Sequence, residues 1–331
     1  MESPALTVVV PAKDAADYLG TTFRSLLRQT EVLEKTQVVF VNDGSTDSTP
    51  DVLAEYGPRF PSFEVLTNRT ALGLASGRNQ GLRAARGEYI VFLDGDDWLP
   101  DGDLALRLDA VRSLDVDFLR TDHVQVEGTR REARRAPMAV RNRVLPARAG
   151  ILPTGQSTMV DYPFAWAGIF HRRLLDDGLL LFPEGFMTAE DRAWIWDLHL
   201  HADTFAVVDG PGVCYRRGVA GSLTKILDPR QLDFIRAFEG IFDLVEDEAD
   251  AALYWDKAAR NWLAILEHQK IRFSASDASL RASFRDGARR ASARIPFEVL
   301  RRQFRSVKHD RQAHVHRFLP HGVELLQEAM R

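Results

Sequence analysis

The stretch that decides the fold is Tyr89-Ile90-Val91-Phe92-Leu93, which is followed directly by Asp94-Gly95-Asp96-Asp97. Five successive apolar residues are typical of a strand that is covered on both faces of its sheet. Carboxylates directly after such a strand are costly to desolvate unless a cation or a donor compensates them. Asp94, Asp96 and Asp97 therefore predict a site at the strand end, suited to a hard divalent cation, Mg²⁺ or Mn²⁺. The alternative is a polar turn in which Asp97 caps the next helix.

The residues on either side of this stretch alternate between short apolar runs and helical patterns. Such alternation predicts an α/β fold with a doubly wound, mainly parallel sheet, whose ligand lies beyond the carboxyl ends of the strands. Thr49 is expected to cap the second helix, with Pro50 at its first position. The expected strands are Leu6–Val10, Val38–Val41, Phe63–Leu66, Tyr89–Leu93 and Asp117–Val126, and the expected helices are Ala15–Arg28, Pro50–Tyr56, Leu74–Ala85 and Leu104–Leu114.

The second part of the chain changes in character twice. Residues 127–150 are rich in arginine and show little periodicity, so we expect a mobile surface loop there. A helix is expected to start near Thr188. From Asp228 onward helical periodicity dominates, and Phe297, Leu300, Phe304 and Val307 are spaced to share one buried face of a helix.

The composition is that of a water-soluble globular protein. The chain has 331 residues, of which 45% are hydrophobic and 27% are charged, and this length suggests about two compact units. One cysteine, Cys214, excludes an internal disulfide framework. The apolar start of the chain meets Pro11 and Lys13 too early for a signal peptide, and no apolar run approaches the ~18 residues of a membrane span. We therefore expect a cytoplasmic protein.

The net charge of −4 hides an asymmetry along the chain. Residues 281–331 hold twelve Lys and Arg against five Asp and Glu, so the rest of the chain is acidic. An acidic body argues against nucleic acid as a partner. The basic C-terminal region is either a solvated helical surface or a contact surface for an anionic polymer, a membrane or a partner protein.

Five motifs in one order give the sequence a family resemblance. They are Val8-Val9-Val10-Pro11, the segment Val41-Asn42-Asp43-Gly44-Ser45-Thr46-Asp47, the segment Gly77-Arg78-Asn79-Gln80-Gly81, the Asp94–Asp97 cluster and Glu190-Asp191. Over roughly residues 5–225 the chain resembles the inverting family 2 glycosyltransferases, which have the Rossmann-like GT-A fold. The resemblance implies a nucleotide-sugar-binding half over 1–126, an acceptor-side half over 127–227 and a helical C-terminal region over 228–331.

The resemblance implies a nucleoside diphosphate sugar, usually a UDP-sugar, as the donor. Pro11 matches the position that lies against the nucleotide, and Asp43 the residue that reads the uracil N3–H. Asn68 and Arg78 match positions that border the base and ribose. Asp94 would lie near the ribose and, with Asp96, would hold Mn²⁺ or Mg²⁺ between the protein and the diphosphate. The chain departs from many members at Lys13, where they have an aromatic residue that stacks on the base.

On the acceptor side, the resemblance assigns the general base to Asp191, with Glu190 supporting it or the acceptor. A helix N-terminus stabilises carboxylates, so local helix-start chemistry explains both residues equally well. Residues 215–224 resemble a loop that closes over the diphosphate, with Arg216, Arg217 and Ser222 as candidate phosphate contacts. One of the two arginines is expected to matter.

The implied activity is metal-dependent, inverting transfer of a hexose or N-acetylhexosamine from a UDP-sugar to a hydroxyl of a glycan, polymer or lipid-linked acceptor, in cell-surface polysaccharide biosynthesis. A place at the inner face of the membrane, or a homo-oligomer, would involve the C-terminal region. The alternatives are a non-catalytic sugar-nucleotide or polymer-binding scaffold and a phosphohydrolase with Asp94 as its nucleophile. Trp98 argues against the phosphohydrolase, because such enzymes usually place a small hydroxyl residue there.

Overall fold

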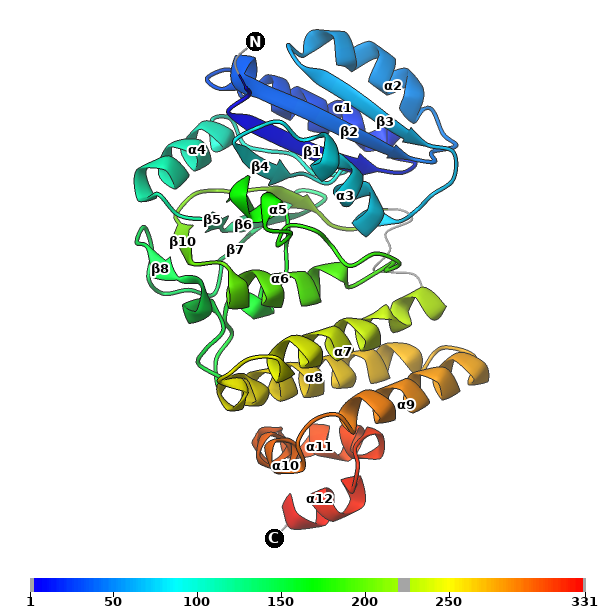
Figure 1. Cartoon of the computed structure of the whole chain (residues 1–331). Coiled ribbons are helices and arrows are strands. Elements are labelled where there is room, and N and C mark those ends of the chain that lie inside the picture. The colour runs from blue at the N-terminus through cyan, green and yellow to red at the C-terminus, as the bar shows by residue number, and fades with distance from the viewer. Residues whose placement is uncertain (1–2, 220–226, 330–331) are drawn as a thin grey trace.

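The computed structural model describes residues 3–219 and 227–329. An eight-stranded sheet in the order β3-β2-β1-β4-β9-β5-β10-β8 forms the upper part of the molecule in Figure 1. Its first four strands are parallel, and β9 pairs antiparallel with both β4 and β5. A second sheet has the order β11-β6-β7. The strands are β1 (Leu6–Ala12), β2 (Thr36–Asp43), β3 (Phe63–Asn68), β4 (Tyr89–Phe92), β5 (Phe118–Thr121), β6 (His123–Glu127), β7 (Arg130–Arg134), β8 (Leu145–Pro146), β9 (Gly168–His171), β10 (Thr204–Val208) and β11 (Cys214–Arg216).

Helices cover the large sheet and then continue as a separate stack toward the C-terminus (Figure 1). The helices of the sheet-bearing part are α1 (Ala16–Leu27), α2 (Thr49–Tyr56), α3 (Leu74–Ala84), α4 (Asp103–Leu114), α5 (Arg173–Asp176) and α6 (Glu190–His201). Those of the stack are α7 (Asp233–Glu246), α8 (Ala251–Phe273), α9 (Ala278–Ser292), α10 (Phe297–Ser306), α11 (His309–Val315) and α12 (Gly322–Ala329). The α/β fold with C-terminal helices is therefore confirmed.

Close packing between α3 and the sheet explains the glycines of the third motif. A Cβ added at Gly81 would lie 2.3 Å from a methyl carbon of Val9, and one at Gly77 would lie 3.3 Å from the Cβ of Pro11. Because no larger residue fits at Gly81 without a shift of β1, these glycines bring α3 against the first strand. The third motif thus seats Arg78 and Asn79 close to the strand ends.

Two predictions about the middle of the chain were wrong. The run Asp117–Val126 is two strands in different sheets, because the chain turns at Asp122, whose carboxylate accepts hydrogen bonds from Ala136 N (2.8 Å) and Arg141 Nη1 (2.9 Å). The stretch 127–150 is not one irregular loop, since β7 pairs antiparallel with β6 and β8 pairs with β10. Four of the five residues of β7 are Arg or Glu, and Ala133 is its one apolar residue, so periodicity could not reveal this strand.

The N-terminus of α2 also differs from the prediction. Thr49 is the first residue of α2 and not its cap, and its hydroxyl accepts a hydrogen bond from Ala15 N at 3.1 Å. Pro50 is the second residue of the helix and not the first, but it still lies in the first turn. The Thr49 side chain therefore joins the loops that follow β1 and β2.

The C-terminal helices share a continuous apolar core with the sheet-bearing part. Buried apolar side chains form one cluster that includes Leu6 of β1, Trp194 of α6, Trp262 of α8 and Leu325 of α12. The helix α7 packs on α6, where a Cβ added at Gly240 would lie 3.8 Å from that of Ala193. Within the described residues, no helix combines the length and apolar character needed to cross a membrane.

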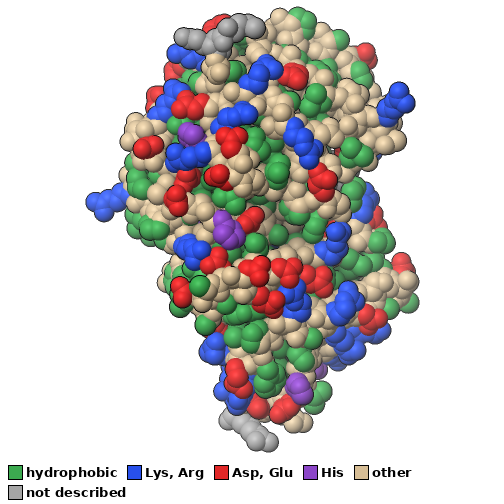
Figure 2. All heavy atoms as spheres, viewed as in Figure 1, with side chains coloured by type: hydrophobic (Ala, Val, Ile, Leu, Met, Phe, Trp, Pro, Cys, Tyr) green, Lys and Arg blue, Asp and Glu red, His purple; other side chains and the backbone are tan. Residues whose placement is uncertain are grey.

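Ion pairs account for much of the positive charge of the C-terminal region. Arg301 and Arg305 pair with Glu328, and Arg302 pairs with Asp256. Leu300 and Phe304 are fully buried, as predicted, whereas Phe297 is partly exposed. In Figure 2, acidic side chains gather over α7 and Lys and Arg side chains over α9. The arginines of α9 include Arg281, Arg285 and Arg289, which are four residues apart and exposed.

Candidate active site

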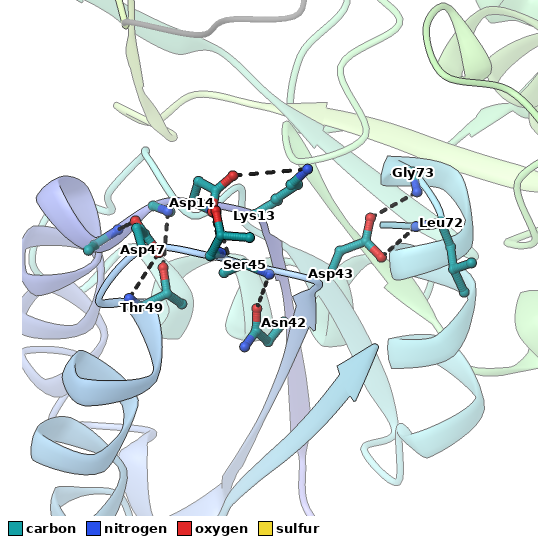
Figure 3. Close-up of polar contacts among 12 residues, drawn as sticks. Lys13, Asp14, Asn42, Asp43, Ser45, Asp47, Thr49, Leu72 and Gly73 are labelled. Carbon is teal, nitrogen blue, oxygen red and sulfur yellow. Dashed lines mark hydrogen bonds and ion pairs between the residues drawn. The ribbon is translucent and has the colours of Figure 1, made fainter. Parts of the chain in front are cut away.

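Asp43, the last residue of β2, joins the end of β3 to the residues that precede α3. Figure 3 shows its carboxylate with Leu72 and Gly73. Its Oδ1 accepts hydrogen bonds from Asn68 Nδ2 and Leu72 N, both at 2.8 Å, and its Oδ2 accepts one from Gly73 N at 2.8 Å. Each carboxylate oxygen has two lone-pair sites, so Oδ2 retains one for a further donor. Asp43 and Asn68, both predicted to border the base, are thus brought together at one edge of the sheet.

Hydrogen bonds connect the loops that follow β1 and β2, beside Asp43 (Figure 3). Asp14 Oδ1 accepts from Thr46 N at 2.6 Å, and Asp47 Oδ2 accepts from Ala16 N at 3.0 Å. Burial opposes ionisation of Asp47, but hydrogen bonds from Thr49 and Ala16 outweigh it and lower its pKa. Lys13 is about half exposed and lies 4.0 Å from Asp14. The second motif therefore fixes the shape of the two loops that follow the strands.

The aspartates after β4 occupy different environments. Burial and the neighbouring Asp94 raise the pKa of the Asp96 carboxyl to about 6. Asp97 is fully buried, its Oδ1 accepts a hydrogen bond from Arg216 N at 2.7 Å, and burial with the charges of Asp96 and Asp94 raises its pKa well above the usual range. Asp97 therefore fastens β4 to β11 and does not cap α4, which leaves Asp94 and Asp96 as the carboxylates for a ligand.

Arg216 is held rigidly beside this cluster. Its Nε donates to the carbonyl oxygen of Asp96 at 2.8 Å, and its guanidinium carbon lies 4.7 Å from the ring centroid of Trp98 and 5.2 Å from that of Tyr18. Arg217 instead lies over Tyr215 and donates to its hydroxyl at 3.3 Å. The structure thus separates the two arginines, and only Arg216 contacts the aspartate cluster. Ser222 lies outside the described residues.

Arg78 bridges the two halves of the candidate site. This side chain is buried, with 3% exposure of the residue, and its Nη2 lies 3.1 Å from Asp94 Oδ1 while its Nη1 lies 2.8 Å from Glu190 Oε1. Burial opposes its charge, but the Asp94 and Glu190 carboxylates outweigh that cost and raise its pKa. One guanidinium therefore joins the end of β4 to the start of α6, which are 96 residues apart in sequence.

The start of α6 carries the candidate base. Glu190 and Asp191 follow Ala189, whose φ of 61° is in the left-handed region that non-glycine residues rarely adopt. Burial, followed by the charge of Glu190, raises the pKa of Asp191 to about 7. A carboxyl with a pKa near neutrality suits general-base catalysis, because about half of it is ionised at neutral pH and the ionised form binds a proton well. Pro11, in β1, lines up with Val41 of β2 on the donor side.

Among residues 3–219 and 227–329, no group of three or more His, Cys, Asp or Glu side chains is placed to hold a metal ion. The aspartate cluster was predicted to offer three charges, but Asp97 is committed to Arg216 N. Sequence reasoning also missed the roles of Tyr18 and Trp98 as the rings that enclose Arg216. No local signal identifies such residues, because ring contacts across 198 and 118 positions depend on the fold.

Comparisons with known proteins identify the family and the fold. A profile described as "Glycosyl transferase family 2" matches residues 7–177. Two Bacillus subtilis proteins are similar: putative glycosyltransferase EpsH is 40% identical over 102 residues, 30% of this chain and 29% of EpsH, and uncharacterized glycosyltransferase EpsJ is 28% identical over 225 residues, 67% of this chain and 64% of EpsJ. The matches thus span less than two thirds of these relatives.

A third relative supplies a structural comparison. The Staphylococcus aureus protein TarS, named a poly(ribitol-phosphate) beta-N-acetylglucosaminyltransferase, is 24% identical over 209 residues, 63% of this chain and 35% of TarS. The crystal structure of its residues 1–349 with UDP-GlcNAc has a TM-score of 0.73, 18% identity and coverage of 98% of this chain and 88% of that chain. At this identity the likeness establishes the fold. Because the family profile matches more than half of the sequence, the chain belongs to glycosyl transferase family 2.

Proposed function

We propose that the chain transfers a hexose or N-acetylhexosamine from a UDP-sugar to a hydroxyl group of a glycan, polymer or lipid-linked acceptor, with inversion at the anomeric carbon. The observation that carries this proposal is the bridge from Asp94 through Arg78 to Glu190. It sets the predicted donor site and the candidate base on two sides of one buried cation. That juxtaposition is what a displacement between a bound donor and an incoming hydroxyl requires.

Asp191 is the proposed general base. The acceptor oxygen forms a bond to the anomeric carbon, the bond from that carbon to the diphosphate breaks, and the acceptor proton passes to the Asp191 carboxylate. UDP leaves with the bonding electron pair. The raised pKa of Asp191 increases its proton affinity, and the nearby Glu190 stays paired with Arg78 throughout.

The carboxylates present fit a divalent ion, Mn²⁺ or Mg²⁺. Asp96 lies in a buried site in which a neighbouring carboxylate disfavours its ionisation, and a cation would relieve that repulsion. Mg²⁺ is commonly held by one or two carboxylates together with substrate phosphates, so a third protein carboxylate is not required. Asp96 and Asp94 would hold the ion, which when bound would offset the negative charge of the diphosphate.

Arg216 is the proposed phosphate contact of the protein. Its guanidinium is fixed by the Asp96 carbonyl oxygen and by the Trp98 and Tyr18 rings, so little side-chain entropy is lost when it binds an anion. Pro11, Asp43 and Asn68 are proposed to receive the nucleoside. Arg78 is proposed to lie between the donor and acceptor subsites and not at the nucleobase, because both of its terminal nitrogens already contact carboxylates.

The similarity to TarS supports UDP-N-acetylglucosamine as the first donor to test and a polyol-phosphate polymer as the first acceptor. We propose that the protein acts in the cytoplasm on cell-surface polysaccharide precursors. The proposal includes the division of the chain into a nucleotide-sugar-binding half over 1–126, an acceptor-side half over 127–227 and a helical C-terminal region over 228–331. The exposed arginines of α9 are proposed to contact an anionic acceptor or the inner membrane surface.

The deciding experiment is a donor screen with an activity readout. Thermal stabilisation is measured with each nucleotide sugar, with and without Mn²⁺, and UDP release is then followed with and without acceptor. We expect one UDP-sugar to stabilise the protein and acceptor-dependent UDP release that D191N abolishes. Donor binding without any turnover would favour the scaffold, and release of inorganic phosphate from phosphate monoesters would favour the phosphohydrolase.

A further inference from the structure

The segment that leads into the candidate base is held by the C-terminal helices. The segment between β9 and α6 ends in Met187, Thr188 and Ala189, directly before Glu190 and Asp191. The Oδ2 of Asp233, the first residue of α7, accepts hydrogen bonds from Met187 N at 2.7 Å and from Thr188 N at 3.3 Å. One carboxylate from the C-terminal region thus binds two successive backbone N–H groups just before the base.

Further contacts bind the same segment to the start of α7. The Thr188 hydroxyl donates to the carbonyl oxygen of Arg230 at 2.8 Å. Arg236 donates to the carbonyl oxygen of Gly185 at 3.1 Å, and its guanidinium carbon lies 4.4 Å from the Phe186 ring centroid. The Asp233 side chain is 14% exposed and pairs with Arg236 at 3.6 Å. The C-terminal residues therefore contact every residue from Gly185 to Thr188.

At its other end the segment is fixed to the donor half. Asn79 of α3 donates to the carbonyl oxygen of Phe182 at 2.9 Å and accepts from Phe182 N at 2.9 Å. The position of the turn between these two anchor points therefore depends on Asp233. Within residues 3–219 and 227–329 no side chain forms a hydrogen bond or ion pair with the Asp191 carboxylate, although the charges of Arg192 and Arg78 act on it. Backbone position, and not a side-chain partner, thus sets where Asp191 lies.

The strained residue between anchor and base makes this dependence sharper. Ala189 is in the left-handed region at φ 61°, a conformation that is unfavourable for an L-residue with a side chain. Such a conformation persists only where the surroundings hold it. If Met187 N and Thr188 N lost their acceptor, the turn would relax and the first residues of α6 would move with it.

We infer that Asp233 is a positioning residue for the Glu190–Asp191 pair, so that α7 of the C-terminal region is part of the catalytic apparatus. The expected effect on kcat rests on the proposed function, whereas the claim that Asp233 holds the segment before α6 does not. Asp233 touches no substrate and acts through the backbone of Met187 and Thr188. The C-terminal region thus has a role in the chemistry besides any contact with acceptor or membrane.

The test compares D233A, which removes the acceptor, with D233N, whose amide oxygen still accepts from both N–H groups. D243N is the matched control, because Asp243 lies on the same helix in a surface ion pair with Arg294 at 2.7 Å. Hydrogen exchange of peptides over residues 183–196 is measured together with kcat, acceptor KM and the affinity for UDP. We expect D233A to exchange at least tenfold faster there and to lose at least tenfold in kcat, with UDP affinity within twofold. D233N is expected to lose about threefold in kcat, and D243N to match the wild type.

The outcomes separate the inference from the proposed function. Unchanged exchange over 183–196 in D233A, or faster exchange with unchanged kcat, would overturn the positioning role. If the wild type transfers no sugar, the proposed function fails, whereas the exchange result still decides whether Asp233 holds the segment. If D233A unfolds, D233N keeps the test. Its loss of kcat should come with faster hydrogen exchange over residues 183–196 than in the wild type. A loss of kcat with wild-type exchange there would contradict the inference.

Discussion

The guanidinium of Arg78 lies 2.8 Å from the carboxylate of Glu190 and contacts Asp94 with its other terminal nitrogen. Arg78 lies on α3, Glu190 on α6 and Asp94 just after β4, so one side chain links the candidate donor residues to the start of α6, which carries the candidate base. The Phe182 ring, with its centroid 5.0 Å from the guanidinium carbon, helps to shield this cluster from water. A cation in this position restrains both carboxylates at once.

We predict that R78K impairs both catalysis and stability. Lysine is a point charge that cannot contact two carboxylates in the geometry of a planar guanidinium. Turnover should fall at least tenfold. R78A, which leaves the buried Glu190 and the partly exposed Asp94 without their cation, should lose about 3 kcal/mol of unfolding free energy in urea titrations. R83K is the control on the same helix, because the ion pair of Arg83 with Glu184 is exposed, and it should change little. Wild-type turnover in R78K would refute the bridging role.

The activity should depend on pH through Asp191. Because the base acts in its ionised form and burial raises its pKa to about 7, kcat/KM should fall about tenfold per pH unit below 7 and level off above it. D191N should abolish transfer while UDP binding stays within twofold. A flat profile from pH 5 to 8 in the wild type would exclude Asp191 as the base.

The same raised pKa predicts an effect on stability. The folded carboxyl binds its proton more tightly than the unfolded one, whose pKa is about 3.9, so ionisation of Asp191 destabilises the fold as pH rises from about 4 to 7. D191N removes that contribution and should raise the melting temperature at pH 7.5 and not at pH 4. D197N is the control on α6, since Asp197 is paired with His201. An unchanged or lower melting temperature at pH 7.5 would contradict the assigned direction.

Asp96 should control metal-dependent donor binding. In D96N, the thermal stabilisation that Mn²⁺ adds to UDP should disappear, because Asp94 alone would hold the ion and Asp94 is already paired with Arg78. D101N is a suitable control, since Asp101 lies a few residues onward in an exposed pair with Arg28. Equal Mn²⁺-dependent shifts in wild type and D96N would place the ion elsewhere.

The two neighbouring arginines should differ. R216K loses the hydrogen bond to the Asp96 carbonyl oxygen and the contacts with Trp98 and Tyr18, so the donor KM should rise at least fivefold. R217K changes a residue whose side chain contacts only Tyr215 among the described residues, and its donor KM should stay within twofold. A larger rise of the donor KM in R217K than in R216K would instead identify Arg217 as the phosphate contact.

The arginines of α9 should govern contact with anionic surfaces. Replacing Arg281, Arg285 and Arg289 with glutamine should weaken binding to a polyol-phosphate polymer and to anionic vesicles, and flatten its dependence on salt. Turnover with a small soluble acceptor should be unchanged. R302Q is the control, because Arg302 is paired with Asp256. If the triple variant binds the polymer and the vesicles as tightly as the wild type does, the arginines of α9 form only a solvated helix surface.

Much of the donor half could be predicted from sequence because its signals are local. Apolar strands end in polar clusters, so β1, β2 and β4 and the edge that carries Asp43 and Asp94 follow from short motifs. The strand β7 could not be found, because its exposed arginines lack period-two hydrophobicity. Arg78 was placed beside the nucleoside by resemblance, whereas its contact with Glu190 spans 112 positions and depends on how α6 packs.

The role of Asp233 in the helical part could not be predicted from the sequence for a similar reason. Asp233 looks like an ordinary acidic residue in the first turn of a helix, and only the folded chain shows its backbone partners. Asp97 was read as a metal ligand or a cap, yet its carboxylate is used by Arg216 N. Residues that act through a distant backbone group carry no motif of their own.

The contact between Ala193 of α6 and Gly240 of α7 limits how this protein can be shortened or recombined. A chain cut after residue 227 would expose apolar surface of α6 to water and would invite aggregation. Chimeras that graft new C-terminal helices onto the sheet would need a small residue opposite Ala193 and an acceptor for the amides of Met187 and Thr188. Exchange of the C-terminal helices therefore has to preserve both of these contacts with α6 and the segment before it.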